Sequence, residues 1–203
     1  MIALGFDTSV AHCAVAVVSR DAVLADLSEP MARGQAERLI PMIEEAFAAA
    51  GIGWGDLGVV GVGTGPGNFT GLRVAVAAAR GMALGADIPA VGVPSGTALS
   101  RGMGPVTVAL PAPRGGVHLV FGAEITTADG GSAVPVGWPM RVTGPGADRV
   151  AGAAMVPAPP WAASVARIAA SRAHAPGPPP APVYLRPADA APASDPPPLI
   201  LDG

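Results

Sequence analysis

The chain has 203 residues, is 50% hydrophobic and carries a formal net charge of −3, which suits one ordinary domain or two small ones around a sizeable core. All 12 basic residues are arginine, so Schiff-base, P-loop and Ser–Lys chemistry are excluded. Cys13 is the only cysteine, the histidines are scattered and no basic run occurs. We therefore expect no intrachain disulfide, no metal site and no independent nucleic-acid-binding surface.

No uninterrupted apolar stretch is long enough to cross a bilayer, and the first residues lack the basic region of a signal peptide. Asp7 also interrupts the first apolar run. We therefore expect a cytoplasmic protein without a membrane partner.

The first fifty residues predict strands followed by a helix. Apolar runs at 2–7, 13–18 and 23–27, joined by short turns, indicate an antiparallel meander. Apolar residues recurring every fourth position then predict an amphipathic helix over 35–50. Pro41 falls inside this helix, which must either start late or kink there.

The next fifty residues continue the alternation. A strand is predicted at 59–62, and a helix at 70–84 with Gly85 as its C-cap. A short strand at 90–93 and a short helix capped by Ser95 follow. This order of elements predicts an α/β protein whose mixed sheet is covered by helices.

The second half is less regular. Strands are predicted at 106–110 and 117–125, with a weaker one near 140–142, and a helix at 161–172. More than half of the 24 prolines lie from Pro157 onward, so we expect much of the C-terminal part to be extended or disordered.

A glycine-dense turn separates the strand at 59–62 from the helix at 70–84. Such an arrangement can bind phosphate on the helix N-terminal amides. However, a GxGxxG fingerprint would need glycine at Asn68, and Walker A needs a lysine. The favoured interpretation is that Gly65-Pro66-Gly67 makes a sharp turn and that Asn68 or Thr70 caps the helix.

Asp7-Thr8-Ser9, at the end of the first strand, is similar to the first phosphate loop of actin-like and sugar-kinase-like ATPases, in which an acidic residue handles Mg²⁺. A turn that Asp7 closes by a local hydrogen bond is the favoured alternative. The weak candidates for cofactor binding are therefore Asp7, Thr8, Gly65 and Gly67.

Two nucleophile arrangements find little support. His12 and Cys13 are neighbours in a strand and point to opposite faces, so Cys13 is predicted to be a core thiol. Ser95, His118 and Asp129 could be assembled into a hydrolase triad, but nothing in their spacing favours it. We expect no catalytic residue in this chain.

The helix predicted at 70–84 has two distinct faces. Leu72 and Val76 begin an apolar stripe, whereas Arg73 and Arg80 lie together on another side, and most of the remaining surface is small. This pattern predicts that the helix packs on its own sheet and also on a partner subunit. A buried, alanine-rich core helix is the alternative.

Several segments resemble the TsaB (YeaZ) family: the opening MIALGFDTSVAHCAVAVV, the helix ERLIPMIEEAF, the turn and helix GTGPGNFTGLRVAVAAARGMALGADIPAVGVPS, and Pro182-Val-Tyr-Leu-Arg186, which matches a PxYLR ending. The glycine turn matches the family motif GPGSFTGLRIG with conservative changes. The resemblance is dense over residues 1–100, sparse to 175 and then returns briefly.

The resemblance implies an actin-like (ASKHA, ribonuclease H-like) α/β fold with two lobes and no catalytic, metal or cofactor site of its own. Proteins of this family pair with TsaD, a homologous transferase that threonylcarbamoylates adenosine 37 of tRNAs reading ANN codons, and a TsaE ATPase joins them. The implied role is a non-catalytic scaffold that meets tRNA only indirectly. Self-association of the isolated chain is expected as well.

The resemblance also divides the chain into an N-terminal lobe (1–104), a reduced C-terminal lobe (105–175) and a proline-rich tail (176–203), whose segment 182–186 could dock back on the domain. In the family, helices of the N-terminal lobe contact TsaD. Carried over by position, the predicted partner interface comprises Leu39, Ile43, Phe69, Thr70, Leu72, Arg73, Val76, Ala77 and Arg80.

The chain departs from the family pattern at two places. Gln35 stands where a histidine is common, and 111–118 replaces a D-A-R-x-x-E-V-Y-like stretch, which argues against ligand binding in the second lobe. An active ASKHA-type kinase or acyl transferase using Asp7 and the glycine turn is the alternative function, although no second Asp-Gly-Gly-like phosphate loop is evident. A peptidase would lack a nucleophile–base pair.

Overall fold

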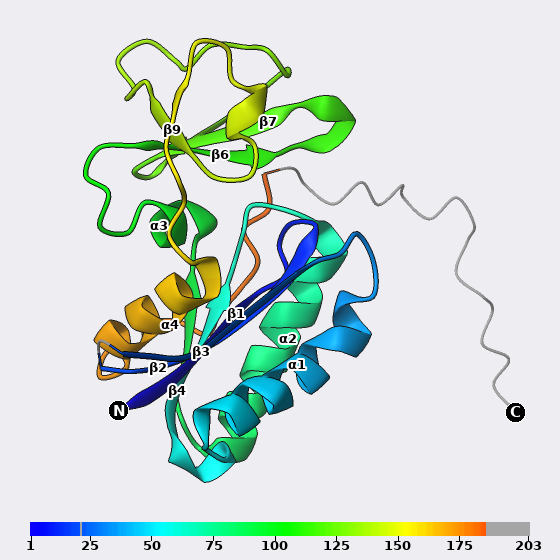
Figure 1. Ribbon diagram of the computed structural model, residues 1–203, viewed down its shortest axis with the longest axis vertical. Helices are drawn as coiled ribbons and strands as arrows, with labels where there is room; N and C mark the ends of the chain where they lie inside the picture. Colours follow the sequence, from blue (N-terminus) through cyan, green and yellow to red (C-terminus); the bar gives the residue numbers. More distant parts are fainter. Residues whose placement is uncertain (21, 186–203) are drawn as a thin grey trace, which may run out of the picture.

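The computed structural model describes residues 1–20 and 22–185, and its first lobe is built on a five-stranded mixed sheet (Figure 1). In sheet order its strands are β3 (Ala22–Pro30), β2 (His12–Ser19), β1 (Ile2–Asp7), β4 (Leu57–Gly63) and β5 (Ala90–Val93). The first three strands pair antiparallel, as the meander predicted, and β4 and β5 join in parallel.

Helices cover both faces of this sheet. Helices α1 (Gln35–Ala50) and α2 (Phe69–Ala86) lie on one face, and α4 (Trp161–Arg172) lies on the other (Figure 1). Because successive strand residues point to opposite faces, Leu4 packs with α1 and α2 while Ala3 packs with α4. Burial on both faces explains why β1, β2 and β4 are almost continuously apolar.

Helix α4 returns the chain from the second lobe to the first. The predicted range 105–175 contains this helix, yet α4 packs on β1 and β4 of the first sheet. A β-carbon at Gly5 would lie 2.4 Å from the Ala166 nitrogen, and one at Gly61 would lie 2.7 Å from the Ala169 Cβ. Glycines on the strands and alanines on the helix therefore allow a very close approach.

The second lobe is another five-stranded mixed sheet, stacked beyond the short helix α3 (Ser95–Leu99) (Figure 1). In sheet order its strands are β10 (Ala154–Met155), β9 (Arg141–Thr143), β6 (Thr107–Pro111), β7 (Val117–Phe121) and β8 (Glu124–Ala128). Single-turn 3₁₀ helices are η1 (Trp54–Asp56), η2 (Pro113–Gly115) and η3 (Ala147–Arg149). The predicted α/β class with two mixed sheets and flanking helices is confirmed.

The prediction of one strand over 117–125 is wrong. The chain turns at Gly122, whose φ is 60°, and Phe121 pairs with Glu124 across a tight hairpin. Glycine adopts this left-handed conformation without steric penalty, so it supplies the turn between β7 and β8.

The end of α2 differs from expectation, whereas α1 has the predicted bounds. Helix α2 runs through Gly85 and is closed by Asp87, whose φ is 52° and whose amide bonds to the carbonyls of the last turn. Aspartate is among the few residues that tolerate this conformation. Helix α1 begins at Gln35 rather than late, with Pro41 on its exposed side. No helix in the described ranges is both long and apolar enough to cross a membrane.

Helix α3 begins without the predicted serine cap. Pro94 occupies the N-cap position and Ser95 is the first helical residue, so its hydroxyl does not cap the helix. By contrast, the predicted cap of α2 is confirmed: the Asn68 side chain accepts a hydrogen bond of 2.9 Å from the Gly71 amide.

Candidate functional site

Asp7 lies at the carboxyl end of β1 and organises the turn into β2. Its Oδ1 accepts hydrogen bonds from the Ser9 amide at 2.8 Å and the Ser9 hydroxyl at 2.7 Å, and His12 Nε2 lies 2.8 Å away. Its Oδ2 is buried and has no hydrogen-bond partner in the described part of the chain. One oxygen of Asp7 thus closes a local turn through hydrogen bonds, which was the favoured alternative to a phosphate loop.

The glycine turn packs directly against this same loop. A β-carbon at Gly67 would lie 2.0 Å from the Ser9 carbonyl oxygen, and one at Gly71 would lie 2.1 Å from that of Thr8. The Asn68 amide donates to Ser9 O at 2.5 Å, and the Thr8 hydroxyl donates to Gly71 O at 2.8 Å. The backbones of the two candidate phosphate loops are therefore in direct contact with each other.

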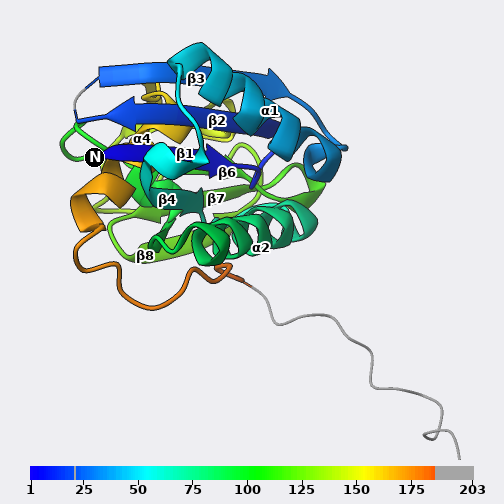
Figure 2. The same ribbon diagram turned by 90° about the horizontal axis from the view of Figure 1, so that it is seen from below.

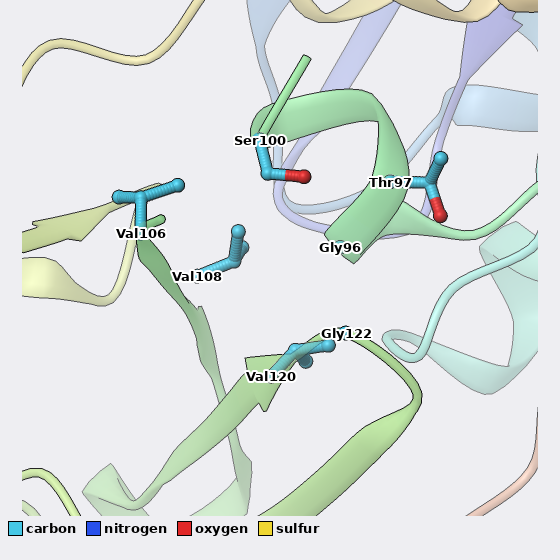
Figure 3. Close-up of a pocket in the computed structure, with 7 residues that line it drawn as sticks. All are labelled: Gly96, Thr97, Ser100, Val106, Val108, Val120 and Gly122. Atoms are coloured by element: carbon cyan, nitrogen blue, oxygen red, sulfur yellow. The ribbon is translucent and has the colours of Figure 1, made fainter. Parts of the chain in front are cut away.

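A small pocket lies between α3 and the second sheet (Figure 3). Valines on or beside β6 and β7 form one wall, and the backbone of Gly96 and the hydroxyl-bearing Ser100 form the other. The lining residues carry no charge, so they cannot neutralise a nucleotide phosphate. Within residues 1–20 and 22–185, no three His, Cys, Asp or Glu side chains gather as metal ligands.

The candidate nucleophiles are not activated. The rings of His12 and Trp161 meet edge to face with centroids 4.8 Å apart on the α4 side, while Cys13 lies in the core on the opposite side. Burial raises the pKa of the Cys13 thiol to about 11. Ser95 Oγ is buried without a hydrogen-bond partner among the described residues, so no base contacts it.

Part of the predicted partner interface is inaccessible. Leu39, Ile43, Leu72 and Val76 are at most 4% exposed and belong to the core between the helices and the first sheet. Their spacing marks the inward stripe of each helix, so the prediction is corrected for these residues. The other predicted interface residues are exposed: Phe69, Thr70, Arg73, Ala77 and Arg80.

These exposed residues define what we call the outer face of α2, together with Leu84, which is 85% exposed. Ala77 and Gly81 form its smooth middle, and nothing lies within 4 Å of where a β-carbon at Gly81 would be. Arginines flank this strip, and large apolar side chains stand at the two ends. Small residues flanked by such groups allow another backbone to come close.

The C-terminal segment completes one end of this face. In Figure 2 the orange segment leaves the end of α4 and runs back to α2. The Val183 amide donates to Thr64 O at 2.8 Å, and Tyr184 packs against Phe69 with ring centroids 5.1 Å apart. Docking was predicted for 182–186, of which Arg186 lies outside the described residues. The sequence pattern did not indicate that Tyr184 forms part of the α2 surface.

Gln35, the departure at the start of α1, has a structural role. It is buried, and its Nε2 donates to the Met31 carbonyl at 3.0 Å. This hydrogen bond ties the preceding loop to the first turn of the helix.

Comparison with known proteins gives consistent matches. A family model described as "TsaD: tRNA N6-adenosine threonylcarbamoyltransferase" matches residues 28–128. The tRNA threonylcarbamoyladenosine biosynthesis protein TsaB of Haemophilus influenzae is 37% identical over 98 residues, which are 48% of this chain and 41% of that protein. The Escherichia coli protein of the same name is 33% identical over 99 residues, 49% of this chain and 42% of that protein.

Among solved structures, YeaZ from Pseudomonas aeruginosa matches with a TM-score of 0.69 and 25% identity, covering 90% of this chain and 98% of that chain. The sequence matches to the two TsaB proteins span less than half the length of those relatives. The structural match spans nearly all of both chains and confirms the predicted fold.

Proposed function

We propose that this chain, a member of the TsaB/YeaZ family, acts in tRNA threonylcarbamoylation as a non-catalytic subunit that binds and activates a TsaD-like transferase. The modified base would be adenosine 37 of tRNAs that read ANN codons, in the cytoplasm. The chain would meet tRNA only through the complex, in which a TsaE-like ATPase also takes part.

The observation that carries this proposal is that the two candidate phosphate loops contact each other, whereas one face of α2 is exposed. The backbones of the Thr8–Ser9 loop and the glycine turn meet each other, whereas the outer face of α2 is exposed and smooth. A surface of this kind suits a protein partner better than a reacting small molecule. The arrangement supports a docking role, with the chemistry performed by the partner.

The choice of partner rests on the similarity between this chain and a TsaD-like transferase. The TsaD model matches residues 28–128, a range that includes α1, the glycine turn and α2. A partner with the same elements would present a similar face, so the two chains could pair about an approximate two-fold axis. The same argument leads us to expect that the isolated chain self-associates through this face.

Co-purification with a TsaD-like partner tests the proposal. We expect Arg73→Glu and Arg80→Glu to abolish co-purification, because each places a negative charge on the outer face of α2. Arg172→Glu is the matched control, since Arg172 is an exposed arginine on α4, across the sheet. Circular dichroism should show every variant folded. Unchanged recovery of the partner with both α2 variants would refute the interface.

One observation favours the alternative of an ASKHA-type kinase or acyl transferase. The buried Oδ2 of Asp7 has no hydrogen-bond partner among the described residues. A carboxylate with one free oxygen can hold a hydrated cation. Direct titration with Mg–ATP distinguishes this alternative from the docking role.

A further inference from the structure

We infer that Arg73 is a carboxylate-binding anchor on the outer face of α2, held in a fixed orientation by Phe69 and by Tyr184. Its occupant is an aspartate or glutamate side chain of the TsaD-like partner. This inference rests on the proposed function and names the contact that would secure it.

Two aromatic rings constrain the Arg73 guanidinium. Its Cζ lies 3.6 Å from the centroid of the Phe69 ring and 5.8 Å from that of Tyr184. Its Nε donates a hydrogen bond of 2.9 Å to the Tyr184 hydroxyl. Stacking and this hydrogen bond together restrict a side chain that would otherwise sample many rotamers.

The terminal nitrogens of Arg73 remain available. In the described ranges neither Nη atom makes a hydrogen bond or an ion pair. Arg38 shows what such a group does when satisfied: its Nη1 and Nη2 each lie 2.7 Å from an oxygen of Glu45. Arg73 presents the same planar pair of donors to the surface, which matches the two oxygens of a carboxylate.

The surroundings of Arg73 favour a strong contact on docking. Phe69 is 44% exposed and Tyr184 45%, so aromatic surface surrounds the charged group. A partner that covers this surface would remove water from the ion pair and strengthen it. Because the guanidinium is already oriented, less conformational entropy is lost on binding.

Tyr184 is in turn held by the main chain. The Val183 amide donates to Thr64 O beside the glycine turn, which fixes the residue before the ring. A C-terminal residue thereby positions a side chain that lies 111 residues earlier in the sequence. Tyr184 is thus a positioning residue, and Arg73 is the group that contacts the partner.

Charge favours a protein carboxylate over a nucleic-acid phosphate. The chain has a net charge of −3 and no lysine, whereas nucleic-acid affinity depends on several clustered cations. Glu37 and Glu44 are exposed on α1, the helix beside α2, and would repel a phosphate backbone.

The test is calorimetric titration of the full chain with the TsaD-like partner at several NaCl concentrations. Arg73→Gln should raise the dissociation constant by about tenfold or more, and Arg73→Lys by nearly as much, because lysine keeps the charge but loses the paired donors. Tyr184→Phe should raise it by about two- to tenfold, since only the orienting hydrogen bond is lost. Arg172→Gln should bind like the wild type.

Salt and spectroscopy separate positioning from general destabilisation. The wild-type dissociation constant should rise more steeply with NaCl than that of Arg73→Gln. Tyr184 is the only tyrosine, so tyrosine-labelled protein reports on its ring alone in NMR. Its resonance should shift in free Arg73→Gln, and in the wild type when the partner is added.

The outcomes distinguish the inference from the proposed function. No binding by the wild-type chain would refute the proposed function. Wild-type binding with unchanged affinity and salt dependence in Arg73→Gln and Tyr184→Phe would overturn only the carboxylate anchor. Loss of tRNA binding in Arg73→Gln, with partner affinity intact, would reassign the site to a phosphate and also overturn it.

Discussion

The backbone of Gly67 lies against the carbonyl oxygen of Ser9, so closely that a β-carbon at residue 67 would fall 2.0 Å from that oxygen. The neighbouring amide of Asn68 donates a hydrogen bond to the same oxygen. The glycine turn is therefore shaped by contact with the β1–β2 loop. This contact places Asn68 at the N-cap of α2 and so sets where the helix begins.

Gly67→Ala should destabilise the protein by about 1–3 kcal/mol or more, because the new methyl group must displace backbone. Gly81→Ala is the matched change inside α2, where nothing lies within 4 Å of the new atom. It should stabilise the protein by roughly 1 kcal/mol through helix propensity. Urea unfolding of both variants checks the prediction, and equal stabilities would contradict it.

Val76→Asp and Ala77→Asp should separate folding from docking. Val76 is 4% exposed in the core, so a charge there is buried without a partner and should prevent cooperative folding. Ala77 is the next residue but faces outward. Its aspartate variant should unfold like the wild type and, under the proposed function, no longer co-purify with a TsaD-like transferase. Thermal unfolding and co-purification measure the two effects, and a folded Val76→Asp would challenge the core assignment.

The purified chain should neither hydrolyse ATP nor bind it tightly. The backbone of the glycine turn is in direct contact with the Thr8–Ser9 loop, and the chain has no P-loop lysine. Calorimetry with Mg–ATP measures this, with Asp7→Ala as the comparison. Tight binding that Asp7→Ala removes would instead favour the kinase or acyl-transferase alternative.

Arg38 should make stability depend on pH in the acid range. Its hydrogen bonds lower the pKa of Glu29 and of Glu45 below the usual 4.5. Because the folded pKa values are depressed, this contribution is complete above about pH 4.5 and is lost as pH falls through the lowered values. The stability difference between wild type and Arg38→Met should therefore shrink on acidification.

Urea unfolding at a series of pH values measures this difference. Glu44→Gln is the control, because Glu44 is an exposed glutamate of α1 that makes no hydrogen bond with Arg38. A constant gap between wild type and Arg38→Met across the acid range would rule out the linkage.

Cys13 should be unreactive in the folded protein. Burial raises its pKa to about 11, so little thiolate exists near neutral pH, and the side chain has no exposed surface. A disulfide reagent at about pH 8 should label it only as urea unfolds the chain. Rapid labelling in native buffer would show that β2 opens locally.

Much of the fold could be predicted because its signals are local. The meander, the helix at 161–172 and the Asn68 cap follow from residue periodicity and hydrogen-bonding chemistry within a few neighbours. Predictions from local sequence were wrong where two local patterns indicated different structures. Gly122 lay within an apolar run yet made a hairpin, and Gly85 looked like a cap although the helix continued to Ala86.

Contacts between distant segments decided the rest. The apolar stripe of α2 is visible in its sequence, yet the family interface carried over by position included Leu72 and Val76, which the packing buries in the core. The sequence did not indicate that α4 would return to the first sheet or that Tyr184 would orient Arg73. Such pairings depend on which surfaces meet once the chain has folded. A periodic pattern shows only that one face of a helix or strand must be buried. Tertiary packing decides which other segment buries it.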